Sequence, residues 1–417
     1  MKKILCLLVL GSMLAFATSV YAQNEVKVDP YGFVLVNANY NDAIAADIPV
    51  KAALGDTLDK GNFLITPRQT RFGLNMSYAT DWTISGKIEL DFWGLKGSGA
   101  NGGVMQSAPR LRLAYFQIQR ENITLLFGQQ WSFFAPLSPT SIAHVSIPEF
   151  SSCGNLWNRF PQLRFEYKAM AGEGNTMLFQ FALIRPLGAD VSPARTQGDE
   201  LGAGEFSQMP FLQGRLSFAA NKTAAVGFSV HFGQEDFHKA DDSGIRDKKT
   251  TTMAVAGDVK FIADMVTFSA EGFWGENLRM LFSNAHLRSE YNSSNDTYTI
   301  KGVEAVGGWG QVSISPPDYN VTFNLGAGME ALKEEHVDSL VGNDDYFNPK
   351  HNPQLLKNMT FFGNIMVKPV KRVTIAFEFN HIKTTYKAME EETKNAMKIA
   401  EKDADDNSVN VGFKFDF

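Results

Sequence analysis

Regular alternation of apolar and polar side chains limits this sequence more than any other feature does. Between positions 82 and 92 one parity is apolar or glycine from Trp82 to Phe92, and the other carries Lys87, Glu89 and Asp91. Successive side chains of a strand point to opposite faces, so this segment predicts a strand with one apolar and one charged face. Similar segments recur near 29–40, 71–78, 109–119, 123–131, 162–168, 176–185, 208–218, 226–232, 250–262, 265–275, 301–314, 321–326, 357–368, 373–380 and 408–417. We therefore expect about 16 strands.

The connections between these segments alternate in length. Short ones fall at 79–81, 120–122, 172–174, 220–222, 263–264, 316–318 and 368–371. Long polar ones fall near 41–66, 95–108, 132–158, 186–207, 235–249, 276–300, 332–356 and 387–406. A soluble β-sandwich has no reason to put every long loop at one end, whereas outer-membrane barrels are built this way. The predicted fold is an all-β, closed antiparallel transmembrane β-barrel, because only closure satisfies every strand hydrogen bond in lipid.

The first 22 residues have the pattern of a secretory signal peptide. Two lysines precede an apolar run at 4–17, and small residues stand at Val20 and Ala22. The alternative, a membrane anchor, needs roughly 20 apolar residues. We expect cleavage after Ala22 and one barrel domain over 23–417, in the bacterial outer membrane. Loss of two leader lysines changes the net charge from −6 to −8, which argues against a nucleic-acid partner.

The last segment ends on aromatic residues that share one parity. Phe413, Phe415 and Phe417 alternate with polar residues, and Phe417 is the final residue. This ending resembles the assembly signal of bacterial outer-membrane barrels. It predicts that the chain interacts with the barrel assembly machinery during insertion and with the lipid bilayer afterwards.

The parity opposite the apolar one is strongly charged. It carries Arg71, Lys87, Glu89, Asp91, Arg110, Arg112, Arg164, Glu166, Arg215, Lys260 and Glu271. Side chains cannot fill a barrel of this size, and charges across a dry core would be costly. The pattern therefore predicts a water-filled porin for small hydrophilic solutes. A transporter plugged by an N-terminal domain is disfavoured, because the first strand begins near residue 29.

The third long connection, 132–158, is unusually apolar. It contains Phe133, Phe134 and Trp157, together with His144 and a single fully charged residue, Glu149. An outward loop of this kind would expose an apolar patch to water. We expect it to fold into the lumen as a constriction loop; burial at a subunit interface is the alternative.

Basic residues of the lumen parity are expected to set ion selectivity. Arg71, Arg110, Arg112 and Arg164 share the lumen parity, and Glu89 and Asp91 come from the strand between those of Arg71 and Arg110. Glu166 and Arg215 extend the set. Arginine grips carboxylates in bidentate fashion, so this wall predicts a preference for small anions, carboxylates especially. The alternative is arginine–acid pairing that only stiffens the wall.

The first half also resembles a known family, the DcaP-like trimeric outer-membrane porins. The matching motifs are YGFV at 31–34, RQTRFG at 68–73, GKIELDF at 86–92, RLR at 110–112, GQQWSFF at 128–134 and RFPQLR at 159–164. This resemblance implies a sixteen-stranded barrel, a homotrimer and uptake of small, often dicarboxylic, anions. It also implies a constriction role for Arg71, Arg112 and Arg164.

Other signals are weaker. The seven histidines show no metal-ligand spacing, and no catalytic motif is found, so we expect no enzyme, metal or cofactor. A substrate-specific channel or binding barrel stays an alternative, and a barrel-type enzyme is less favoured. The acidic run 403–406 fits a solvated charge run better than a calcium site, and 387–402 has a helical composition, which predicts a surface helix. The glycine-rich run 307–310 predicts close backbone approach or a subunit contact.

Overall fold

The structure is a computed structural model. It describes residues 26–42, 47–54, 61–79, 81–94, 107–172, 174–187, 202–237, 245–247, 249–292, 294, 297–342, 353–393 and 396–417. The predicted signal peptide, 1–22, lies outside the described residues.

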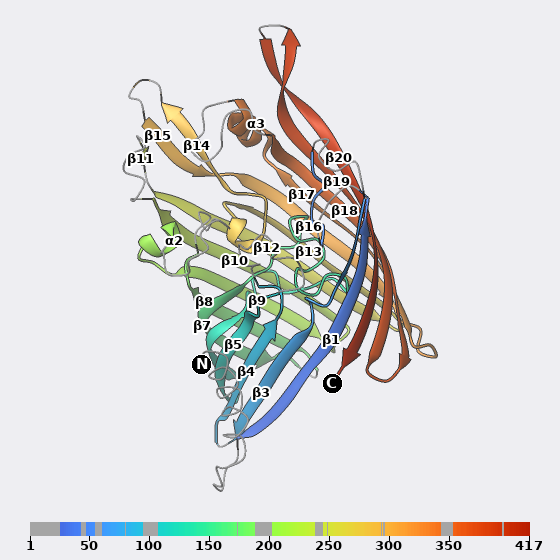
Figure 1. The fold of residues 1–417 in the computed structure, drawn as a ribbon. Coiled ribbons are helices and arrows are strands. Elements are labelled where there is room, and N and C mark those ends of the chain that lie inside the picture. Colours follow the sequence, from blue (N-terminus) through green and yellow to red (C-terminus); the bar gives the residue numbers. More distant parts are fainter. Residues whose placement is uncertain are drawn as a thin grey trace, which may run out of the picture.

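One antiparallel sheet curls into a closed barrel (Figure 1). It contains 17 strands. The short strand β2 (Asn62–Thr66) pairs with residues Asn37 to Asn41 of β1, and the other sixteen strands form the ring. Closure comes from β1 and β20, which pair from Phe33↔Asp416 to Asn41↔Ser408. The ring strands are β1 (Lys27–Asn41), β3 (Arg71–Ala79), β4 (Thr83–Asp91), β5 (Arg110–Arg120), β6 (Ile123–Trp131), β7 (Arg159–Met170), β8 (Thr176–Ile184), β9 (Phe211–Ala220), β10 (Ala224–Asp236), β12 (Lys249–Ala263), β13 (Val266–Glu276), β16 (Glu304–Ile314), β17 (Val321–Leu332), β18 (Gln354–Val370), β19 (Val373–Thr393) and β20 (Ala396–Asp416). The expected fold and strand number are confirmed.

The outer surface is apolar and the inner surface is polar, as the alternation predicts. Leu325 and Phe377 are 68% and 54% exposed, whereas their neighbours Asn324 and Glu378 are 1% and 3% exposed. Such a continuous apolar surface is incompatible with water and fits lipid. Among the described residues no helix is both long and apolar enough to cross a bilayer.

The strand ends that the short turns join lie at one end of the barrel, and those that the long connections join lie at the opposite end (Figure 1). The short turns use left-handed backbone at residues such as Glu121, Asn221 and Asp264. The long-loop end carries the remaining elements, a three-stranded sheet of β11 (Ile245–Asp247), β14 (Leu287–Asn292) and β15 (Thr297–Gly302), with α2 (Ala203–Phe206), η3 (Arg279–Leu281) and α3 (Glu334–Gly342).

The helix expected at 387–402 is wrong. The described residues of this range, 387–393 and 396–402, belong to β19 and β20, which continue beyond the barrel as a long hairpin (Figure 1). Cross-strand pairs stabilise it, including Lys402 to Glu390 at 3.0 Å and Lys383 to Asp403 at 2.8 Å. Opposite charges facing each other across a ladder outweigh a modest helix propensity. The acidic run 403–406 therefore lies in a strand rather than in a loop.

Candidate functional site

The connection 132–158 runs through the interior of the barrel. On one side, the backbone N–H of Leu137 donates to Glu271 of β13 at 2.6 Å, and that of Thr140 donates to Gln311 of β16 at 2.7 Å. On the other side, Arg110 of β5 donates to the Ser146 carbonyl at 3.1 Å. We call this segment the inward loop. Its contacts with opposite walls place it inside the barrel, not on the outer surface.

The five loop residues singled out from the sequence are all buried. Phe133, Phe134, Trp157, His144 and Glu149 are between 0% and 8% exposed. Phe134 lies edge-on to the ring of His231 on β10, with centroids 6.1 Å apart. The apolar side chains thus pack on the wall and on each other, which is how so apolar a loop is kept out of water.

Gln69 is the main polar tether of the inward loop. It lies in the break between β2 and β3 and is fully buried. Its amide nitrogen donates to the Ala143 carbonyl at 2.6 Å, and its oxygen accepts the backbone N–H groups of Val145 and Ser146, both at 2.8 Å. The sequence analysis did not select this residue, although it stands in the RQTRFG motif.

Glycines of β16 and β17 let the tip of the inward loop approach the wall. A Cβ on Gly328 would collide with the Cys153 carbonyl, and a Cβ on Gly154, whose φ is +101°, would collide with Gly308. The Cys153 thiol donates to the Gly328 carbonyl at 3.2 Å. The glycine-rich run 307–310 therefore serves close backbone approach within the chain, one of its two predicted roles.

The arginines of β5 pair with the acids of β4. Arg112 is fully buried, with Nε 2.8 Å from Glu89 and a terminal nitrogen 2.9 Å from Asp91. Arg110 also contacts Asp91, at 2.6 Å, and Arg71 lies 3.6 Å from Glu89. A β-bulge interrupts the β4–β5 register after Glu89, next to this cluster. Side-chain exposure is 0% for Arg112, 17% for Arg71 and 25% for Arg110, so Arg110 is the most open to solvent of these three arginines.

Other predicted site residues lie on neighbouring strands. Arg164 is 3.3 Å from Glu166 and 4.9 Å from the ring of Phe133, whereas Arg215 forms a separate buried pair with Asp258 at 2.5 Å. Arg71, Arg110 and Arg112 therefore form one ion-paired cluster with Glu89 and Asp91, which we call the arginine cluster. Arg164 pairs with Glu166 on β7, and Arg215 pairs with Asp258 on the β9 side.

Arg159, at the start of β7, is a basic residue that the sequence analysis did not select. Its guanidinium lies 4.8 Å from the Trp131 ring and 5.6 Å from the Trp157 ring. Within the described part of the chain it forms no ion pair, and one buried terminal nitrogen has no hydrogen-bond partner. The RFPQLR motif could have pointed to Arg159, because this residue shares the motif with Arg164.

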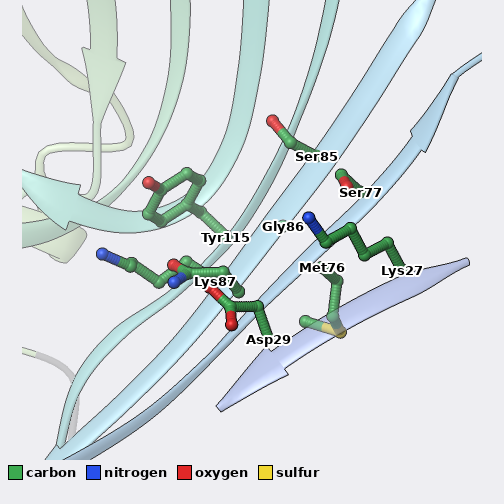
Figure 2. A pocket seen from close by; sticks show the side chains of 9 residues that line it. Lys27, Asp29, Met76, Ser77, Ser85, Gly86, Lys87 and Tyr115 are labelled. Atoms are coloured by element: carbon green, nitrogen blue, oxygen red, sulfur yellow. The ribbon is translucent and has the colours of Figure 1, made fainter. Parts of the chain in front are cut away.

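A pocket lies closer to the short turns than the arginines do, and Figure 2 shows side chains that line it. It has a volume of about 270 Å³ and is lined by Lys27, Asp29, Asn75, Met76, Ser77, Ser85, Gly86, Lys87 and Tyr115. The Lys87 amine lies 4.5 Å from the Tyr31 ring, and the Tyr31 hydroxyl donates to Glu89 at 2.7 Å. The pocket therefore adjoins the arginine cluster and extends its basic lining toward the turns.

A second group of titratable side chains joins the inward loop to β19. His144 and Glu149 meet Glu378, and their nitrogen and oxygen atoms all lie within 4.8 Å of one another. Burial lowers the pKa of His144 to about 4, and burial together with the Glu378 carboxylate raises the pKa of Glu149. Histidine spacing could not reveal this group, because Glu378 comes from a distant strand.

Comparison with known proteins identifies the fold. No family model matches the chain, and no curated protein sequence matches it. The outer membrane channel DcaP of Acinetobacter baumannii is similar in structure, with a TM-score of 0.66 at 20% identity over 96% of this chain and 99% of that one. OmpT of Vibrio cholerae in its trimer form has a TM-score of 0.54 at 10% identity, covering 94% and 99%. OmpF of Salmonella typhi has 0.53 at 12%, covering 94% and 98%. The expected likeness to DcaP is confirmed at the level of the fold, and this chain has the barrel fold of outer-membrane porins.

Proposed function

We propose that this protein is an outer-membrane porin for small hydrophilic solutes, with a preference for small anions such as carboxylates. The observation that carries the preference is the composition of one stretch of inner wall. Arg71, Arg110, Arg112, Arg159 and Arg164 lie there on β3, β5 and β7, and among the described residues their ion-pair partners are Glu89, Asp91 and Glu166. Lys87 continues the positive lining into the adjacent pocket. An excess of fixed positive charge beside a water-filled path attracts anions.

The arginines are proposed to have two different roles. Arg112 is fully buried between Glu89 and Asp91, so it stiffens the wall and cannot reach a passing solute. Arg110 and Arg71 keep part of their surface open and supply the charge that a solute meets. We therefore propose that both interpretations of the sequence hold for different residues. Arginine–acid pairing stiffens the wall at Arg112, and anion attraction comes from Arg110 and Arg71.

Planar-bilayer recording under a salt gradient tests this proposal. The reversal potential of the wild-type channel is expected to be shifted from zero toward the chloride equilibrium potential. Arg110→Gln should move the reversal potential back toward zero. A unit charge about 4 Å from an ion is worth about 1 kcal/mol in water, so the anion permeability should fall roughly fivefold when this charge is removed. Asp91 keeps Arg112 and Ser146 as partners in this variant, which preserves the wall.

The matched control is Arg185→Gln. Arg185 has a 49% exposed side chain and pairs with Glu205 at 2.9 Å, away from the arginine cluster. Its loss should leave the reversal potential unchanged. A wild-type channel that prefers potassium, or an equal response to both substitutions, contradicts the anion preference.

A narrower, substrate-specific channel is the second candidate. The observation that favours it is the inward loop, which is fastened to opposite walls of the interior. The same recordings distinguish the two. Large stepwise conductance supports a general porin, and small conductance blocked by millimolar dicarboxylate supports the specific channel.

A homotrimer is the proposed assembly. OmpT of Vibrio cholerae, which shares this fold, is described in a trimer form. Native mass measurement in detergent is expected to give three chains per particle, and a monomer at all concentrations contradicts the proposal.

A further inference from the structure

Two buried carboxylates lie together at the contact between the inward loop and β19. Glu149 is 2% exposed and Glu378 is 3% exposed. Among the described residues no lysine or arginine pairs with either of them; the nearest basic group is His144, whose Nε2 lies 3.1 Å from Oε2 of Glu149. An isolated buried charge is costly, and two adjacent carboxylates are more so.

Hydrogen bonding satisfies these carboxylates unequally. Glu378 accepts the side-chain amides of Asn364 at 2.8 Å and Asn380 at 3.2 Å. Oε2 of Glu149 is buried and, although His144 Nε2 lies 3.1 Å away, accepts no hydrogen bond in the described part of the chain. It points at His144 and toward Glu378 instead, with all three ligand atoms inside 4.8 Å. A buried acceptor without a donor is the feature expected where a cation is missing from the set.

We propose that His144, Glu149 and Glu378 bind one divalent transition-metal ion, which fastens the inward loop to the barrel wall. An imidazole nitrogen with two carboxylate oxygens is a donor set suited to Zn²⁺, whose ligands stand about 2.0–2.2 Å from the ion. Ligand atoms within 4.8 Å of one another close around such an ion by small side-chain shifts. Two carboxylates and a 2+ ion also cancel in charge, which removes the cost of burying them.

A cavity of about 10 Å³ borders His144 and Asn380 on one side of this group, close to the volume that one water molecule occupies. The Asn380 side-chain oxygen is buried and without a hydrogen-bond partner among the described residues. Calcium is a poorer fit, because it takes six to eight oxygen ligands.

Zinc binding by the full-length protein in detergent tests this site. Any histidine tag is removed, the protein is stripped with a chelator, and Zn²⁺ is titrated against a competing chelator. Retained metal is then counted by mass spectrometry. One Zn²⁺ per chain is expected, with X-ray absorption showing nitrogen and oxygen ligands only. An equal concentration of Ca²⁺ should not displace it.

Glu149→Gln and Glu378→Gln should each weaken binding by more than the roughly 10- to 100-fold lost when an outer-shell partner of a metal ligand is removed. Both substitutions remove a buried charge and keep the side-chain shape, and heat-modifiable gel mobility reports whether each barrel is folded. Glu330→Gln is the matched control, because Glu330 is equally buried but accepts hydrogen bonds from Ser283 and Asn284. The proposal is overturned if the wild type does not hold stoichiometric Zn²⁺. It is also overturned if the folded Glu149→Gln and Glu378→Gln variants bind Zn²⁺ with the same affinity as the wild type. None of these results depends on channel activity.

Discussion

At the scale of single residues, the inward loop depends on side chains that replace missing backbone partners. Gln69 satisfies two loop N–H groups and one loop carbonyl, a role usually filled by a neighbouring strand. Asn37 on β1 adds a bond to the Ile142 carbonyl at 3.0 Å. A few wall amides therefore hold a segment that has almost no regular secondary structure.

Gln69→Leu should loosen the inward loop. The variant keeps the side-chain volume but leaves the buried N–H groups of Val145 and Ser146 without acceptors, at a cost of roughly 1–3 kcal/mol each. We expect a lower thermal unfolding temperature in detergent and noisier single-channel current. Gln119→Leu, an exposed glutamine at the turn end of β5, should leave both unchanged. Equal behaviour of the two variants would show that Gln69 is not a tether.

At the scale of elements, the wall of β16 and β17 is shaped to receive the loop tip. Gly328→Ala places a Cβ against the Cys153 carbonyl, and overpacking of this kind costs about 1–3 kcal/mol. The tip should move away from the wall and expose Cys153, which is otherwise fully buried. Burial also raises the pKa of this thiol, which keeps it unreactive in the wild type.

Maleimide labelling of Cys153 measures that displacement. Slow labelling is expected for the wild type and fast labelling for Gly328→Ala. Gly257→Ala is the control, because its Cβ would meet nothing closer than a carbonyl at 3.8 Å. Rapid labelling of the wild type would mean that the tip is not held against β17.

Elements also show how far the sequence could predict this structure. The alternation gave the strands and turns, because each side of the wall meets a different solvent. The apolar composition of the connection 132–158 predicted the burial of Phe134 and Trp157. The sequence could not predict contacts between segments far apart in the chain, such as Glu378 beside Glu149 or Arg159 on two tryptophan rings. It also could not predict the β19–β20 hairpin at 387–402, because cross-strand ion pairs there override the local helix propensity.

At the scale of the whole molecule, closing the ring is the step that removes the last open sheet edges. β20 pairs with β1 there, and Phe417 lies over the seam. Its N–H donates to the Gly32 carbonyl at 3.1 Å, and its ring lies 5.5 Å from that of Phe72 on β3. A Cβ on Gly32 would lie only 2.7 Å from the Phe417 ring, so glycine makes room for it. The final residue thus contacts both strands that follow the seam.

Phe417→Ser should therefore slow assembly more than the loss of an outward phenylalanine elsewhere. Phe377 on β19 is comparably exposed to lipid, at 54% against 41%, but it pairs with Val411 within β19–β20 and not across the β1–β20 seam. Both serine variants lose apolar transfer free energy of about 1.5–3 kcal/mol. Only Phe417→Ser also loses the contacts across closure, so it should give less heat-modifiable barrel in the outer membrane and slower refolding into detergent. Equal yields and refolding rates for the two variants would show that Phe417 contributes only its apolar surface and that the seam closes without it.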